Sequence, residues 1–197
     1  MAREASVERN TKETEIKLKL TLDGTGYSDI ETGVGFFNHM LDGFTRHGLF
    51  DLCVRVHGDL EVDDHHTIED TGIVLGTAIK EAIGDKKGIR RYGSCILPMD
   101  EVLCTLCNRP FPAGHIFSWD AEFTSEKIGD MSTEMVKEFF YAISYSCGMN
   151  LHIKVLTGGN SHHVAEAMFK SFAKALDQAV SYDPRITDVL STKGSLA

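Results

Sequence analysis

Residues 48–56 read GLFDLCVRV, and residues 148–156 read GMNLHIKVL. In both stretches a glycine precedes a run in which apolar residues recur at every second position, as in a β-strand with one buried face. A helical pattern of apolar residues comes before each stretch, at residues 35–47 and 133–147. The two stretches therefore predict an internal duplication, in which both halves of the chain repeat one order of strands and helices.

The remaining apolar patterns extend this repeat over most of the chain. They predict strands at residues 13–22, 27–31, 52–56, 94–108, 114–121 and 151–155, and helices at residues 35–47, 65–83, 133–147 and 162–180. We expect residues 27–31 to pair back on the strand before them. The fold class is then α/β, an α+β two-layer sandwich, in a single domain of residues 1–197. Its repeats cover about residues 13–93 and 94–182, and a polar C-terminal tail follows.

The composition is that of a globular protein with a core, because 42% of the residues are hydrophobic and 25% are charged. The net charge is −9 and no basic run occurs, so we expect neither nucleic acid nor an anionic membrane as a partner. The apolar runs are far shorter than the roughly 18 residues that a membrane span needs. The N-terminus has no apolar secretory signal, and we therefore expect a cytoplasmic protein.

The chain has an odd number of cysteines, and they are Cys53, Cys95, Cys104, Cys107 and Cys147. In a chain of this size, such a set argues against a disulfide framework. Cys104 and Cys107 form a C-x-x-C motif, but they lie in a predicted strand, where positions three apart face opposite sides. We therefore expect buried thiols rather than a zinc site.

One motif occurs twice, as DDHHTIED at residues 63–70 and as SHHVAEA at residues 161–167. Both copies read His-His-x-x-Glu at the start of a predicted helix, directly after Asp64 or Ser161, and both residue types are good N-caps. Neighbouring side chains on a helix point about 100° apart, so the two histidines of one pair cannot easily bind the same metal ion. Each motif therefore offers ligands to two different ions.

The spacing also predicts which histidine accompanies the glutamate. Residues three apart share a helix face, which pairs His66 with Glu69 and His163 with Glu166. The leading histidines of the two pairs, at positions 65 and 162, then point elsewhere. Each motif would give a histidine and a glutamate to one metal ion and a single histidine to the other.

A fourth ligand for each ion comes from the helix that precedes the motif. His39 lies in the first of these helices, and Glu138 takes the corresponding place in the second. Imidazole and carboxylate ligands with spare coordination positions suit manganese or iron. A capped or solvated histidine is the alternative for any one of these residues. A capping box does not explain the two glutamates, because the acidic position of such a box falls on Thr67 and Val164.

Four stretches resemble one known family: GFFNHMLDGFTRHGLFDL, GDLEVDDHHTIEDTGIVLG, NSHHVAEAMFKSFAKAL and the terminal STKG are similar to imidazoleglycerol-phosphate dehydratases of histidine biosynthesis. The resemblance runs from about Glu13 to Gly194. It implies a ribosomal-protein-S5-domain-2-like fold, two Mn2+ ions in each active site, and a homo-oligomer (a 24-mer) with active sites between subunits. It assigns one manganese ion to His39, His66, Glu69 and His162, and the other to His65, Glu138, His163 and Glu166.

The same resemblance assigns residues to the substrate, D-erythro-imidazole-glycerol phosphate, which would lose water to give imidazole-acetol phosphate. The substrate-binding residues would be Glu15, His39, His47, His65, Glu69, Arg91, Arg109, His162, Lys170, Ser191, Thr192 and Lys193. Arginine suits the phosphate because its planar guanidinium donates two hydrogen bonds at once. The catalytic candidates are Glu15, Glu69 and His65, and we expect Glu15 to move the protons.

Two other functions use the same residue types. A dinuclear metal hydrolase acting on a small phosphorylated substrate would also combine histidines with carboxylates, but it would release phosphate from esters. A metal-storage bundle of the ferritin type uses Glu-x-x-His on four long helices. The reverse order of the motif and the predicted strands argue against the storage function.

Overall fold

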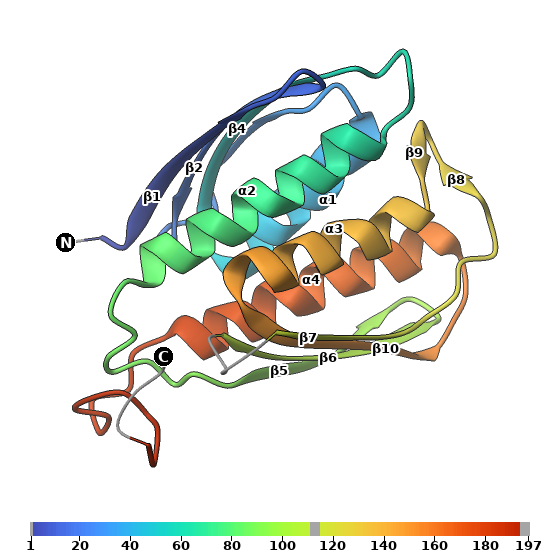
Figure 1. Cartoon of the computed structure of the whole chain (residues 1–197). Coiled ribbons are helices and arrows are strands. Elements are labelled where there is room, and N and C mark those ends of the chain that lie inside the picture. Colours follow the sequence, from blue (N-terminus) through green and yellow to red (C-terminus); the bar gives the residue numbers. More distant parts are fainter. Residues whose placement is uncertain (1, 111–114, 194–197) are drawn as a thin grey trace.

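The computed structural model describes residues 2–110 and 115–193. Two four-stranded sheets lie on either side of four helices (Figure 1). The helices are α1 (Gly35–Gly48), α2 (His65–Ile83), α3 (Glu134–Cys147) and α4 (Ser161–Val180). The strands are β1 (Glu4–Asn10), β2 (Thr14–Thr21), β3 (Ser28–Glu31), β4 (Asp51–Gly58), β5 (Gly93–Met99), β6 (Val102–Pro110), β7 (Ile116–Asp120), β8 (Lys127–Ile128), β9 (Met131–Ser132) and β10 (Met149–Thr157).

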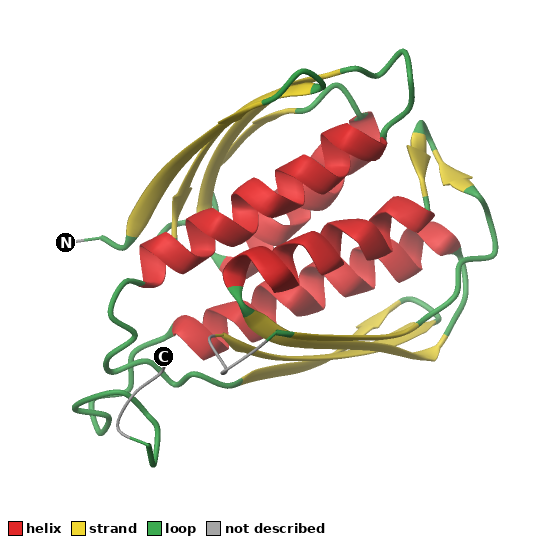
Figure 2. Cartoon of the chain, viewed as in Figure 1, coloured by secondary structure: helices red, strands yellow, loops and turns green. Residues whose placement is uncertain are grey.

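The two large sheets have the same topology. Their strand orders are β1-β2-β4-β3 and β5-β6-β10-β7, and in each sheet only the last strand runs parallel to its neighbour. Each sheet is covered on one face by two helices, which confirms the predicted α/β class and its two-layer halves (Figure 2). The short hairpin β8–β9 forms a sheet of its own and occurs only in the second half.

Three strand predictions need correction. Residues 28–31 pair in parallel with β4, and not back on β2, because helix α1 carries the chain across before β4 returns. Residues 94–108 form two strands, since the chain turns at Asp100, whose backbone is left-handed with a φ of 49°. Strand β1 was not predicted, because its inward face holds only small, half-buried or charged residues such as Ala5 and Arg9. The predicted strand 114–121 begins outside the described residues.

The helices of one half pack against those of the other, with α2 beside α3 and α1 beside α4. Gly72 and Gly76, which lie about one helical turn apart in α2, allow this close approach. A Cβ at Gly72 would lie 2.8 Å from the carbonyl oxygen of Phe139, and one at Gly76 would lie 2.9 Å from that of Ile143. All four helices begin at the same end of the molecule, on the right in Figure 1. The residues that open α2 and α4 therefore gather at one end.

The cysteines follow the predicted strand alternation only in part. Cys104 is buried and Cys107 is exposed, which is the opposite-face arrangement expected for positions three apart. The prediction that both thiols of the C-x-x-C motif are buried is wrong for Cys107, whose side chain lies on the outer face of its sheet. Among the described residues all five cysteines are free. The same part of the chain has no helix with the length and apolar character of a membrane span.

Candidate metal and substrate site

A compact group of possible metal ligands lies where α1 packs against α4. The Nε2 atom of His39 is 3.1 Å from Oε1 of Glu166, and Nε2 of His162 is 3.9 Å from Oε2 of the same glutamate. One ligand atom from each residue can be chosen so that all three lie within 4.8 Å of one another. The site therefore brings two imidazoles and one carboxylate to a space that one cation could fill.

The corresponding place in the other half lies between α2 and α3. There His65 Nε2 is 3.6 Å from Oε2 of Glu69, just as His162 approaches Glu166 in α4. Glu138, which takes the place of His39, is half-buried on α3. The side chain of Glu138 makes no hydrogen bond or ion pair with another described residue. The second group of ligands is thus less complete in one subunit than the first.

The structure corrects the pairing that was predicted inside each motif. Each glutamate lies beside the leading histidine, four residues earlier, and not beside the second one. Residues four apart also share a helix face, so the spacing alone allowed both pairings. The second histidines turn away to acids outside their own helix, where Nδ1 of His66 is 3.0 Å from Asp59 and Nδ1 of His163 is 2.9 Å from Glu101. Those two acids were missed, because they lie in connecting loops without a sequence pattern.

The predicted N-cap position is correct for α2, where Asp64 is the N-cap residue but makes no capping hydrogen bond with its side chain, and one residue too late for α4. The helix N-terminus of α4 is capped by Asn160, which accepts a hydrogen bond from the amide of His162 at 2.9 Å. In the same way, Asp63 accepts from the amide of His65 at 2.8 Å. Asp64 instead accepts hydrogen bonds from the amide and hydroxyl of Ser132 in β9, at 2.6 and 3.0 Å.

Ser161 likewise holds the segment before β8 and β9. Its hydroxyl oxygen accepts hydrogen bonds from the amides of Thr124 and Ser125, at 3.1 and 3.2 Å. One stretch of chain, residues 124–132, is therefore attached to the starts of both ligand-bearing helices. This attachment fixes α2 and α4 relative to each other at the end where the histidines lie.

The charges around Glu166 keep it ionised. Burial on its own would raise the pKa of Glu166, but the ammonium of Lys170, 3.3 Å away, and the nearby His162 and His39 lower it further than burial raises it. Burial lowers the pKa of His47, and the charges of the neighbouring Lys170 and Lys174 add to this shift. The site therefore offers a carboxylate ligand beside a fixed positive charge.

Two of the arginines assigned to the phosphate meet at the far end of the second sheet. The guanidinium carbons of Arg91 and Arg109 lie 5.6 and 5.7 Å from the ring centroid of Tyr92. Burial lowers the pKa of Arg91, and the charge of Arg109 contributes to the same shift. Arg91 is buried, and its guanidinium donates to the carbonyl oxygen of Leu190, which places the tail with Ser191 beside it.

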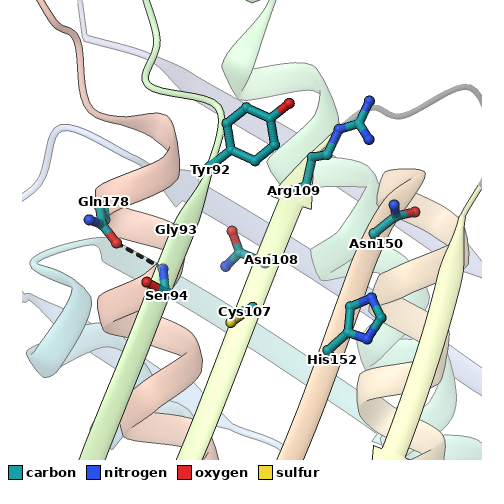
Figure 3. Close-up of a pocket in the computed structure, with 9 residues that line it drawn as sticks. All are labelled: Tyr92, Gly93, Ser94, Cys107, Asn108, Arg109, Asn150, His152 and Gln178. Atoms are coloured by element: carbon teal, nitrogen blue, oxygen red, sulfur yellow. Dashed lines mark hydrogen bonds between the residues drawn. The ribbon is translucent and has the colours of Figure 1, made fainter.

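A pocket of about 450 Å³ opens next to these arginines (Figure 3). Its walls include Tyr92, which is the residue before β5, Arg109 of β6, and Asn150 and His152 of β10. Among the described residues, the Nε atoms of Arg91 and Arg109 and the amide nitrogen of Asn108 are buried without a hydrogen-bond partner. Unpaired buried donors of this kind favour an anionic ligand.

The two arginines assigned to the phosphate lie at the opposite end of α4 from the metal-ligand group, whereas Lys170 lies beside Glu166. The amide of Arg91 donates to the carbonyl oxygen of Ala179 at 2.7 Å, and Ala179 follows Glu166 by 13 residues on this helix. At 1.5 Å per residue, that is a separation of about 20 Å. Thr192 and Lys193 follow Ser191 in the described tail, and Gly194 lies outside it. One subunit on its own therefore does not bring these two groups together.

Glu15 lies apart from both groups. In β2 the side chains of Ile16 and Leu18 are buried under the helices, so Glu15 projects from the outer face of the sheet. It is exposed, and its Oε1 lies 3.9 Å from Nζ of Lys17 in the same strand. The carboxylate is therefore free to meet a group outside its own subunit.

Comparison with known proteins identifies the family of this chain. The sequence model described as imidazoleglycerol-phosphate dehydratase matches residues 32–176. The protein of that name from Lachnoclostridium phytofermentans is 61% identical over 200 residues, and the alignment covers 100% of both chains. The chain belongs to the imidazoleglycerol-phosphate dehydratase family. The dehydratase from Acetivibrio thermocellus is also similar, with 54% identity over 100% of both chains.

Solved dehydratase structures share the fold. The crystal structure of the enzyme from Staphylococcus aureus aligns with a TM-score of 0.82 and 38% identity, covering 91% of this chain and 99% of that one. The enzyme from Pyrococcus furiosus aligns with a TM-score of 0.81 and 30% identity, covering 96% and 100%. The chain is therefore an enzyme of the hydro-lyase class that serves histidine biosynthesis, and the family predicted from its motifs is confirmed.

Proposed function

We propose that this dehydratase removes water from D-erythro-imidazole-glycerol phosphate in a manganese-dependent reaction, to give imidazole-acetol phosphate. The observation that carries the metal proposal is the group formed by His39, His162 and Glu166, whose ligand atoms can all lie within 4.8 Å of one another. Two imidazoles and a carboxylate fit manganese, which accepts nitrogen and oxygen ligands and keeps open coordination positions. Bound manganese would act as a Lewis acid toward the imidazole ring of the substrate.

We infer two manganese ions in each active site, because the ligand types recur in both halves. The first set is His39, His162 and Glu166, and the second is based on His65 and Glu69. The second histidines, His66 and His163, and the half-buried Glu138 complete the ligands expected from the family resemblance. Their distribution over two helices of each half agrees with ions that are shared between subunits.

A shared site also supports the oligomer. Arg91 and Arg109 lie about 20 Å along α4 from Glu166, by the rise of an α-helix, which is too far for one small substrate to touch both groups in one subunit. Active sites between subunits of a 24-mer would join the metal-ligand end of one chain to the arginines of another. Lys170, which lies 3.3 Å from Glu166, would contribute its charge at the metal end.

The proton would be transferred by a carboxylate that lies outside the two groups of metal ligands. Glu15 is exposed on the outer face of its sheet, so it can reach a substrate that another subunit binds. Glu69 pairs with His65 at 3.6 Å, which favours a ligand role for both residues over proton transfer. We therefore assign the proton transfer to Glu15.

The decisive experiment is product formation from imidazole-glycerol phosphate before and after chelation. Activity should disappear when the metal is removed and return when Mn2+ is added, because the proposed ligands bind the ion that activates the substrate ring. Activity that survives complete metal removal contradicts the two-metal account. Release of inorganic phosphate in place of the keto product would favour the dinuclear hydrolase. The cytoplasmic location stays a prediction, which fractionation of the cells can test.

A further inference from the structure

The second histidine of each pair is held from outside its helix in the same way. The Nδ1 atom of His66 lies 3.0 Å from a carboxylate oxygen of Asp59, and Nδ1 of His163 lies 2.9 Å from one of Glu101. In both rings the same nitrogen faces the acid. The other nitrogen, Nε2, lies farther from the acids near it. It is 3.9 Å from Glu13 in His66 and 3.4 Å from Asp100 in His163.

The two acids do not occupy equivalent positions in the two halves. Asp59 follows the end of β4, whereas the residue after the end of β10 is Gly158. Glu101 lies in the turn between β5 and β6. Different parts of the fold thus bring a carboxylate to the same ring atom of corresponding histidines. Because the two contacts come from different parts of the fold, they favour a shared requirement of the two histidines.

The carboxylate of Glu101 is itself held firmly. Its Oε1 accepts a hydrogen bond from the amide of Asn160 at 2.6 Å, while Oε2 faces His163. Gly159 makes room for it, because a Cβ at that position would lie 2.2 Å from the carboxylate oxygen. The acid is therefore bound to the chain just before α4 and to the third residue of that helix at the same time.

We propose that Asp59 and Glu101 are positioning residues for the metal ligands His66 and His163. A carboxylate that accepts from Nδ1–H keeps the proton on that nitrogen and leaves the lone pair on Nε2 for a metal ion. It also fixes the ring plane, and such outer carboxylates tune metal affinity in proteins. The proposal rests on the proposed metal-dependent function, and it adds two residues that do not touch the ion.

The test is the affinity of the purified, metal-free enzyme for Mn2+, measured from the free-ion signal in electron paramagnetic resonance titrations. In Glu101→Gln the amide oxygen can still accept from Asn160, but the NH2 group opposes Nδ1–H and favours the other tautomer. We expect one class of sites to bind Mn2+ about 10- to 100-fold more weakly, with an unchanged melting temperature. Excess Mn2+ should restore turnover. Asp59→Asn should have the same effect through His66.

Glu4→Gln is the matched control, because it removes the same charge from an exposed ion pair on the outer face of the first sheet. In this pair, Oε2 of Glu4 lies 3.1 Å from Nζ of Lys19. Its Mn2+ affinity should equal that of the wild type. If the wild type binds no Mn2+, the proposed function fails together with this inference. If the wild type binds two ions and both Glu101→Gln and Asp59→Asn bind them equally well, the inference alone is overturned. The inference is also overturned if the two variants melt at a lower temperature and bind Mn2+ equally weakly at all sites, because the two acids would then have a merely structural role.

Discussion

The two histidines of each motif have separate tasks at the scale of the residue. The leading histidine shares a helix face with the glutamate four positions later, as His162 does with Glu166. The second histidine leaves that face and meets an acid from a loop, as His163 meets Glu101. Because neighbouring helical side chains diverge by about 100°, this division gives each ring its own partner. The adjacent pair is therefore a means of reaching two places from one turn of helix.

Glu138 is the residue whose role is most open to test. It stands on α3 where His39 stands on α1, and a carboxylate can bind manganese in place of an imidazole. Glu138→Ala should weaken one of the two Mn2+ sites and leave the site of His39 unchanged, whereas Glu138→His should restore the binding. The measurement is a calorimetric titration of metal-free protein. Two unchanged sites in Glu138→Ala would remove this residue from the ligands.

Glu15 gives a second prediction at the same scale. Glu15→Gln keeps the size of the side chain but removes its ability to accept a proton. We expect a loss of about 100- to 10 000-fold in kcat, the range typical of a general base, with KM and Mn2+ content unchanged. Steady-state kinetics and metal analysis measure these quantities. A kcat equal to that of the wild type would exclude Glu15 from proton transfer.

At the scale of elements, the site depends on how closely helices from opposite halves pack. The pair α1 and α4 brings His39 to Glu166, and the pair α2 and α3 is drawn together at Gly72 and Gly76. Residues 124–132 join the first turns of α2 and α4 through Asp64 and Ser161. The positions of the ligands therefore follow from helix packing and from one connecting segment.

Gly76→Ala tests that packing. The new Cβ would lie 2.9 Å from the carbonyl oxygen of Ile143, which is backbone and cannot move alone. We expect a loss of about 1–3 kcal/mol in the free energy of unfolding, as for other overpacked cores, although alanine is the better helix former. Urea denaturation measures the change.

Gly43→Ala is the control for this substitution. Gly43 lies in α1 with no atom within 4 Å of an added Cβ, so only the helix propensity changes. We expect a gain of about 0.5–1 kcal/mol. Equal stability of the two variants would contradict the close contact of α2 and α3.

At the scale of the whole molecule, one chain separates the three groups of residues that the proposed reaction would combine. The ligand group lies at the start of α4, the two arginines near its end, and Glu15 on the outside of the first sheet. Every helix begins at the same end of the molecule (Figure 1), and the hydrogen bond from the amide of Arg91 to Ala179 places the arginines near the other end of α4. The arrangement fits a protein that completes its sites by assembly.

Subunit complementation tests this reading. Glu15→Gln and Arg109→Ala should each be nearly inactive when expressed alone. Co-expressed in one cell, they should form mixed oligomers in which some sites receive an intact Glu15 from one chain and an intact Arg109 from another. Part of the activity should then return in the purified mixture. Its continued absence, with mixed oligomers shown by mass spectrometry, would contradict shared sites.

The motifs and their alternation were enough to predict the family, the α/β class and the four helices within a residue or two. Those features depend on local periodicity, which the chain carries in itself. Side-chain pairing within His-His-x-x-Glu was not predictable, because spacings of three and four both share a helix face. Strand β1, the partner of β3 and the acids Asp59 and Glu101 depend on residues far apart in the chain. Only the packed structure decided those contacts, since they form where loops and helices from distant segments meet.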